Sequence, residues 1–212
     1  YETLHQNSGR AYVFHGSATG PSLTPSWSTY ATDVDARLGG SVGTAGDVNG
    51  DGYADVVVGA FNQTNPAAPF PDEGRAEVFL GSAAGLDTVA VWQTYGGQPN
   101  AHYSWSCGSA GDVNGDGFGD ILVGAPLYIG DQFQEGRAYL YLGAASGLAL
   151  EPAWSSIASQ NSALLGSAMA AVGDVNGDGF GDVVVGAPQH DGSLTDDGQA
   201  MLFLGSANGL TS

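Results

Sequence analysis

The feature that most constrains this chain is an acidic segment that occurs three times. It reads Gly-Asp-Val-Asn-Gly-Asp-Gly-(Tyr/Phe)-X-Asp at 46–55, 111–120 and 173–182. Counted from the first Asp, residues 1, 3 and 5 direct side-chain oxygens to one point, and glycine at position 6 lets the chain reverse. The carbonyl of residue 7 and the carboxylate of residue 9 can complete the shell. Such a mixed oxygen cage suits Ca²⁺, whereas Mg²⁺ requires a tighter octahedron with fewer protein ligands.

The same five positions of each copy supply the predicted ligands. Residues 1, 3, 5 and 9 would bind through side chains, and residue 7 through its backbone carbonyl. These residues are Asp47, Asn49, Asp51, Tyr53 and Asp55; Asp112, Asn114, Asp116, Phe118 and Asp120; and Asp174, Asn176, Asp178, Phe180 and Asp182. We expect three Ca²⁺ ions, one per loop, to stabilise the fold.

Two other interpretations of the acidic segment are an EF-hand and a solvated acidic turn. An EF-hand places a bidentate Glu at position 12, where the three copies have Val58, Val123 and Val185. Apolar, β-branched residues surround those valines, so the loop is predicted to lead into a strand and not into a helix. A solvated turn would explain one copy but not three in the same register.

A second segment recurs in register with the acidic loops. It begins at 9–17 as Gly-Arg-Ala-Tyr-Val-Phe-His-Gly-Ser and returns with substitutions at 74–82, 136–144 and 198–206. Its copies start 65, 62 and 62 residues apart, and the acidic loops start 65 and 62 residues apart. A constant period with variable connections indicates a repeat architecture.

Within one period the sequence predicts four short antiparallel strands, at roughly 40–45, 54–60, 75–80 and 88–93. Each is β-branched or aromatic and is bounded by Gly, Pro, Asn and Asp. No window has a sustained helical period. The fold class is therefore all-β, and repeated four-stranded units indicate β-propeller blades. A β-sandwich would not require so strict a period, and a calcium β-roll would have a much shorter one.

The repeats resemble the FG-GAP repeats of integrin α-subunit propellers and of related bacterial proteins. The resemblance depends on the acidic loops and on a Gly-Ala-Pro motif after the second strand of the repeat. That motif stands at 124–126 and 186–188, with 59–61 as a Gly-Ala-Phe variant. The Phe-Gly half of the family pattern is degraded, reading Leu-Gly at 38–39, Tyr-Ser at 103–104 and Leu-Gly at 165–166.

This resemblance implies that residues 1–212 form a single FG-GAP propeller region. The repeat units are approximately 9–73, 74–135 and 136–197, followed by a partial unit at 198–212. We expect about three blades, with a first blade that lacks two strands and a last blade that lacks its outer strand. The family implies a ring of about seven blades. Further blades from a longer parent chain, or copies of this chain in a homo-oligomer, would complete it.

Acidic residues far outnumber basic ones. The chain has 22 Asp and Glu against four Arg, with a formal net charge of −18, and three bound Ca²⁺ ions would leave about −12. Such a charge argues against nucleic acid or an anionic membrane as partner, and no apolar run is long enough to insert into a membrane. The chain is predicted to be extracellular or at the cell surface, where calcium is plentiful. Cys107 is predicted to be a small buried residue.

The resemblance implies that ligands bind on the face opposite the calcium loops. The segments on that face break the repeat and carry scattered aromatic and polar side chains: Phe61, Phe70, Tyr95, His102, Tyr103, Tyr128, Phe133 and His190. We expect an extracellular protein or a glycan to bind through these loops, and each of these side chains either contacts that ligand or only caps its own blade. Residues that recur in register are predicted to be structural; they are Trp27, Trp92 and Trp154, together with Arg10, Arg75 and Arg137.

The chain is predicted not to be an enzyme. It has no Ser-His-Asp order, zinc-ligand spacing or phosphate loop, and an enzyme requires a convergent acid, base or nucleophile. The leading hypothesis is a calcium-stabilised binding or adhesion module. The alternative is the propeller domain of a secreted hydrolase or polysaccharide lyase, which an acid–base cluster at the ring centre would favour.

Overall fold

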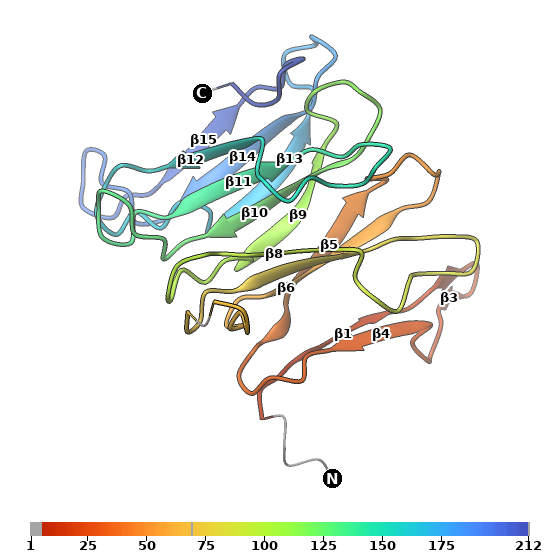
Figure 1. Ribbon diagram of the computed structural model, residues 1–212. Helices are drawn as coiled ribbons and strands as arrows, with labels where there is room; N and C mark the ends of the chain where they lie inside the picture. Colours follow the sequence, from red (N-terminus) through yellow and green to blue (C-terminus); the bar gives the residue numbers. More distant parts are fainter. Residues whose placement is uncertain (1–5, 69, 212) are drawn as a thin grey trace.

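The computed structural model describes residues 6–68 and 70–211, and the regular elements in this part of the chain are all β-strands. No helix among these residues has the length and hydropathy that are needed to span a membrane. The strands follow one another as antiparallel neighbours and form successive blades (Figure 1). The fold is therefore all-β and built from propeller blades, as predicted.

Two blades have four strands each. The first comprises β5 (Leu38–Gly46), β6 (Asp55–Ala60), β7 (Arg75–Phe79) and β8 (Trp92–Tyr95). The second comprises β9 (Ser106–Gly111), β10 (Asp120–Ala125), β11 (Arg137–Tyr141) and β12 (Trp154–Ile157). In both, the strands lie in sequence order across the sheet, and each neighbouring pair is antiparallel.

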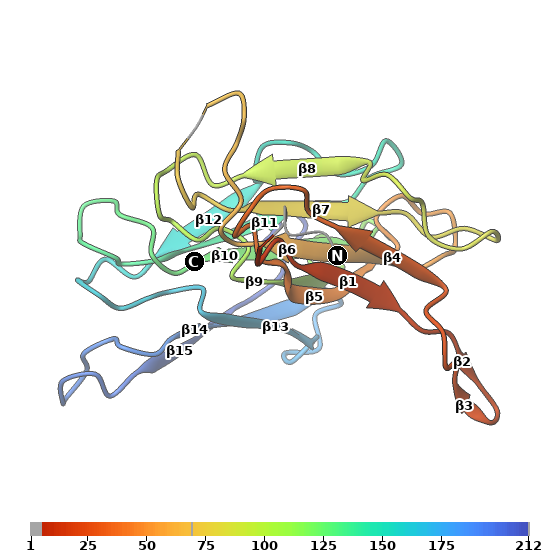
Figure 2. The ribbon, with the colours of Figure 1, turned by 90° about the horizontal axis from the view of Figure 1, so that it is seen from below.

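Two further sheets repeat parts of the same pattern. A three-stranded sheet contains β13 (Ala168–Gly173), β14 (Asp182–Ala187) and β15 (Gln199–Phe203), and a two-stranded sheet pairs β1 (Arg10–Val13) with β4 (Trp27–Tyr30). Because β1 carries the Gly-Arg-Ala segment that also opens β7 and β11, β1 and β4 correspond to third and fourth strands. A short hairpin of β2 (Gly16–Ser17) and β3 (Gly20–Pro21) connects β1 to β4 along the chain and extends beyond the ends of these two strands (Figure 2).

The predicted strand positions agree with the structure except at the fourth strand of the blade. A strand was expected at 88–93, but β8 begins at Trp92. Val89 and Val91 suggested a strand by their alternation, yet both are exposed. They belong to the connection that brings the chain back to Val78, where pairing with Trp92 begins. The alternation of these valines does not mark a strand, because neither valine is buried against a sheet and both lie in the loop before β8.

The hydrophobic core is divided into three clusters, each shared by two neighbouring blades. One cluster joins Val78 and Trp92 of the β5–β8 blade to Ile121 and Tyr141 of the β9–β12 blade. The first strands of successive blades lie next to one another: β5 contacts β9, and β9 contacts β13. The apolar face of each blade that precedes the β13–β15 sheet is therefore covered by the next blade, as in a propeller. Cys107, predicted to be buried, is half-buried, and burial raises its pKa to about 11.

The recurring tryptophans join the blades, as the sequence predicted. Each lies on a fourth strand and packs edge-on against an aromatic ring in the third strand of the next blade. The ring pairs are Trp27–Phe79, Trp92–Tyr141 and Trp154–Phe203, with centroids 4.8–5.0 Å apart. Trp92 Nε1 also donates a 2.8 Å hydrogen bond to the Ala149 carbonyl. Such edge-to-face contacts stabilise beyond the area they bury.

Replacing Trp92 by Ala tests this role of the tryptophans. Trp92 is 5% exposed between two blades, so Trp92→Ala should lower the free energy of unfolding by about 3–5 kcal/mol. Trp105 is 44% exposed and lies outside the repeat register, so Trp105→Ala serves as control and should cost less than about 1 kcal/mol. Denaturant unfolding measures both. Equal losses would contradict the assignment of Trp92 to blade packing.

Candidate metal centre

The acidic loops connect the first and second strands of three blades and share one hydrogen-bond pattern. In the loop between β9 and β10, the Asp112 carboxylate accepts N–H groups from Gly115, Asp116 and Gly117, at 2.7, 3.1 and 2.9 Å. Asp47 and Asp174 accept the equivalent three N–H groups in their loops. Residue 1 therefore fixes the turn through its own carboxylate, and Gly117, with φ of 89°, takes the left-handed conformation that the turn requires.

Residues 3 and 5 lie beside residue 1 in the same turn. The Asn114 side chain donates to Asp116 Oδ2 at 2.8 Å, and its own oxygen accepts the Asp116 N–H at 3.2 Å. That N–H is also shared with Asp112. The oxygens of residues 1 and 3 thus meet at the N–H of residue 5, while the carboxylate of residue 5 accepts from the Asn side chain, and the other two loops repeat the arrangement.

Residue 9 differs from the other acidic residues because it is buried. Asp120 has no exposed surface, and its two oxygens accept the Val113 N–H at 2.8 Å and the Gly143 N–H at 2.9 Å. Burial raises the pKa of Asp120 to about 6; the nearby charges of Asp116 and Asp112 add to this, while the two backbone hydrogen bonds oppose it. Asp120 thereby ties its loop to the turn that follows the third strand.

The corresponding residues of the other two loops make the same ties. Asp55 accepts N–H groups from Val48 and Gly81, and Asp182 accepts them from Val175 and Gly205. Both aspartates are fully buried. The sequence assigned residue 9 to the metal shell alone and missed this structural role, although its recurrence immediately before a buried strand was a visible signal.

The residues of each loop fit a hard cation through the chemistry of their donors. Among residues 6–68 and 70–211, no three Asp, Glu, His or Cys side chains gather into a metal-binding group. Each turn instead combines two carboxylates with an Asn amide oxygen, next to the buried carboxylate of residue 9. Because a carboxylate has about four lone-pair sites, two N–H bonds at residue 9 leave sites for an ion. An all-oxygen donor set of this kind matches Ca²⁺.

The acidic loops also contact one another across the blade interfaces. Gly119 donates its N–H to the Asp47 carbonyl at 2.7 Å, and Gly181 donates to the Asp112 carbonyl at 2.9 Å. Residue 2 of a loop accepts from the next blade as well, since Ala144 N–H reaches the Val48 carbonyl at 3.0 Å. The conformation of one loop therefore determines how the following blade is held.

The Gly-Ala-Pro motif joins the blades at the opposite face. A side-chain carbon on Gly124 would overlap the carbonyl of Gly166, and one on Gly59 would overlap that of Ser104. Both carbonyls belong to the chain that enters the first strand of the next blade. Ser104 Oγ adds a 2.7 Å hydrogen bond to the Arg75 carbonyl. Glycine is needed in this motif because two backbones approach there.

The variable loops at this face bring three aromatic side chains together. Trp105 stacks on His102, with ring centroids 5.9 Å apart and planes 7° apart, and Phe61 contacts Trp105 and His102 at 4.8 and 5.7 Å. Burial lowers the pKa of His102, which favours the uncharged ring. We call Phe61, His102 and Trp105 the aromatic cluster. The sequence named Phe61 and His102 among its ligand candidates but gave Trp105 no role.

Other loop candidates have different surroundings. Tyr103 is fully buried, and its hydroxyl is within 2.7 Å of Thr94 Oγ1 and donates to the Tyr141 hydroxyl at 2.9 Å, so it is a core residue. Phe70, Tyr95 and Tyr128 line a cavity between two blades. Phe133 and His190 belong to the loops after β10 and β14.

The comparisons with known proteins identify the repeats. A family model described as FG-GAP repeat matches residues 39–72, 105–141 and 165–203. Human integrin alpha-8 is 30% identical over 181 residues, integrin alpha-4 of Xenopus laevis 33% over 183, and integrin alpha-IIb of Mus musculus 39% over 121. These matches cover 83%, 85% and 54% of this chain but 16%, 16% and 12% of the relatives. The chain thus corresponds to a small part of each.

Substitutions in one loop separate the two roles of its carboxylates. Asp120→Ala removes the acceptor for two buried N–H groups and should cost about 2–5 kcal/mol of unfolding free energy. The amides of Val113 and Gly143 should lose protection from hydrogen exchange. Asp116→Asn, in the exposed turn, retains an oxygen for the Phe118 N–H and should leave both amides protected. Protected amides in Asp120→Ala would contradict the structural role of residue 9.

Proposed function

The chain belongs to the FG-GAP repeat family, and on that premise we propose that it is a calcium-stabilised, extracellular β-propeller module for binding or adhesion. It would recognise a protein or glycan ligand through its variable loops. The observation that carries the proposal is the chemical difference between the two faces. One face has the regular acidic loops, and the other has loops of unequal length with the aromatic cluster.

We propose one Ca²⁺ ion in each loop, held by the fifteen residues that the sequence singles out. Residues 1, 3 and 5 would bind through their side-chain oxygens, residue 7 through its carbonyl, and residue 9 through the lone pairs that its backbone hydrogen bonds leave free. When bound, the ion supplies positive charge to a group of carboxylates that otherwise repel one another. The loops' own N–H groups already orient residue 1 for this role.

The ligand-binding surface in this proposal is the face with the variable loops. Trp105 is 44% exposed there, on the segment that enters β9. Aromatic side chains supply large contact areas with little loss of conformational freedom. Because β6 and β9 are held rigidly within their blades, Phe61 and Trp105 are presented by a fixed scaffold. This surface suits a protein or a glycan better than an anionic polymer, since the chain carries a formal charge of −18.

We propose further that additional blades complete the ring, from the same parent chain or from another copy. The support is the uncovered face of the β13–β15 sheet: β13 is largely exposed, whereas the equivalent strand β9 lies between two neighbours. Leu202 of β15 is exposed as well. An open sheet edge and an apolar face favour completion by another blade. We propose no catalytic role, and no particular observation favours the hydrolase or lyase alternative.

A binding screen tests the proposed function. Calcium-loaded protein should capture a ligand from arrays of extracellular proteins and of glycans. Because the loops hold neighbouring blades in position, excess chelator should remove most of this binding. Trp105→Ala should weaken capture about tenfold or more, as removal of a central aromatic contact does, while Trp105→Phe should weaken it less. Binding that is unchanged in Trp105→Ala and in chelator would contradict the proposal.

A further inference from the structure

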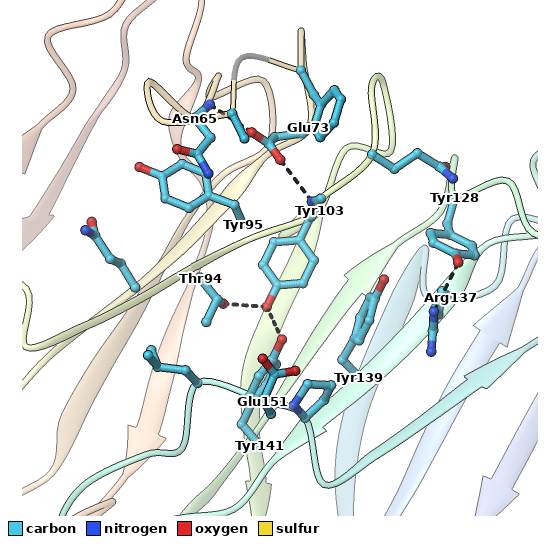
Figure 3. A pocket seen from close by; sticks show the side chains of 18 residues that line it. Asn65, Glu73, Thr94, Tyr95, Tyr103, Tyr128, Arg137, Tyr139, Tyr141 and Glu151 are labelled. Atoms are coloured by element: carbon cyan, nitrogen blue, oxygen red, sulfur yellow. Dashed lines mark hydrogen bonds between the residues drawn. The ribbon is translucent and has the colours of Figure 1, made fainter.

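A polar cavity of about 660 Å³ lies between the two complete blades. One wall is β8, with Gln93, Thr94 and Tyr95, and the other is β11, with Arg137, Tyr139 and Tyr141 (Figure 3). Pockets of this size accommodate small ligands such as one or two sugar rings. The cavity is separate from the acidic loops, whose residues are absent from its lining.

Arg137 makes no ion pair among the described residues, whereas its counterpart in the preceding blade makes one. In the preceding blade Arg75 pairs with Glu77, two residues further along the strand, at 3.1 Å. Tyr139 stands at the position of Glu77 in the β9–β12 blade. Within residues 6–68 and 70–211, the Arg75–Glu77 contact is the one ion pair that the structure contains. Arg137 is therefore a cation beside a cavity with no carboxylate in ion-pair contact; Glu135, two residues earlier, is fully buried, and its carboxylate oxygens have no hydrogen-bond partner among the described residues.

The Arg137 guanidinium is held in place by neutral groups. The rings of Tyr128 and Tyr139 each lie 5.0 Å from Cζ. Its terminal nitrogens donate to the Tyr128 hydroxyl at 3.1 Å and to Ser155 Oγ at 2.6 Å, while its buried Nε has no partner in the described part of the chain. These contacts satisfy two of about five N–H groups. The cation is thus oriented but not neutralised, which favours an incoming anion.

The rest of the cavity wall suits sugar hydroxyls. The Thr94 hydroxyl, the Tyr103 hydroxyl and the Tyr141 hydroxyl form a chain in which Tyr103 donates to Tyr141 (Figure 3). The proton of Tyr141 is then available to a ligand. Burial raises the pKa of Tyr139 and Tyr141, so both remain hydroxyl donors at neutral pH. Tyrosine rings with amide and hydroxyl groups supply stacking faces and hydrogen bonds together.

Two acidic residues near the cavity limit the charge of the ligand. Glu73 is fully buried, and its oxygens accept the N–H groups of Asn65 and Gly97 at 2.9 Å. Burial raises the pKa of this carboxyl. Glu151 lies on the lining and is exposed. With a chain charge of −18, a polyanion would be repelled, so the cavity fits a ligand with one isolated carboxylate.

We propose that this cavity binds a uronic acid residue of a glycan. The sugar carboxylate pairs with Arg137, the sugar ring lies against the tyrosine wall, and ring hydroxyls bond to Tyr141 and Gln93. The inference rests on the proposed binding function and names the ligand class for one site within it. It also gives Arg137 a role beyond the structural one that its repeat register predicted.

Methyl β-D-glucuronide and methyl β-D-glucoside test the proposal. They differ only at C6, which is a carboxylate in the glucuronide and a neutral hydroxymethyl group in the glucoside. Titrations of the calcium-loaded chain, followed by NMR, should show the glucuronide binding about tenfold or more tightly than the glucoside. Arg137→Gln should abolish that preference. Arg75→Gln is the matched control on the neighbouring blade and should retain it. Arg137→Lys, which keeps the charge without the planar fork, should bind several-fold more weakly yet still prefer the glucuronide.

Three results would overturn the inference: no glucuronide binding, unchanged binding in Arg137→Gln, or acetate binding as tightly as the glucuronide. Melting temperatures of the variants show whether each is folded, and Arg137→Lys keeps the test valid if Arg137→Gln is not. If the arrays give a ligand but the glucuronide does not bind, the inference fails and the proposed function stands. If the glucuronide binds but Trp105→Ala does not weaken array capture, the inference is supported and the variable-loop proposal fails.

Discussion

Each complete acidic loop depends on one buried carboxylate, the last Asp of its motif. Asp55, Asp120 and Asp182 have no exposed surface, and each accepts one N–H from its own loop and one from the turn after the third strand. A buried charge is costly unless it is hydrogen-bonded and balanced. The hydrogen bonds are present in the structure, and the proposed calcium ion would supply the balancing charge. Metal, loop and blade then form one cooperative unit.

This unit extends from blade to blade because the loops contact one another. The carbonyl of residue 1 accepts an N–H from the next loop, and the carbonyl of residue 2 accepts one from the next blade's turn. At the other face the backbone of Gly124 meets that of Gly166, and in the core Trp92 meets Tyr141. Regular contacts thus fix the scaffold, while the variable loops, including those that carry the aromatic cluster, are free to differ.

The sequence predicted the repeated parts well because their physical causes are local. Alternating oxygens, a turn glycine and β-branched runs identify the loops and three of four strands in a blade. The strand predicted at 88–93 was wrong because Val89 and Val91 alternate without a sheet to cover them. The aromatic cluster and the Arg137 cavity could not be predicted, because the packing of successive blades alone brings Phe61 against Trp105 and places Tyr95 and Arg137 around one cavity. The sequence shows Tyr139 at the repeat position that Glu77 occupies in the preceding blade. Only the structure shows that Arg75 pairs with Glu77, and therefore that Arg137 makes no such pair.

The melting temperature of the purified chain in calcium, in excess chelator and in magnesium tests the central claim most directly. If each of three sites contributes about 2–3 kcal/mol at a hundredfold excess of calcium over its dissociation constant, chelation should lower the melting temperature by on the order of 15–30 °C. Magnesium should restore little, because it does not fill an all-protein oxygen cage well. A melting temperature that is the same in calcium and in chelator would show that the loops hold the blades without a metal.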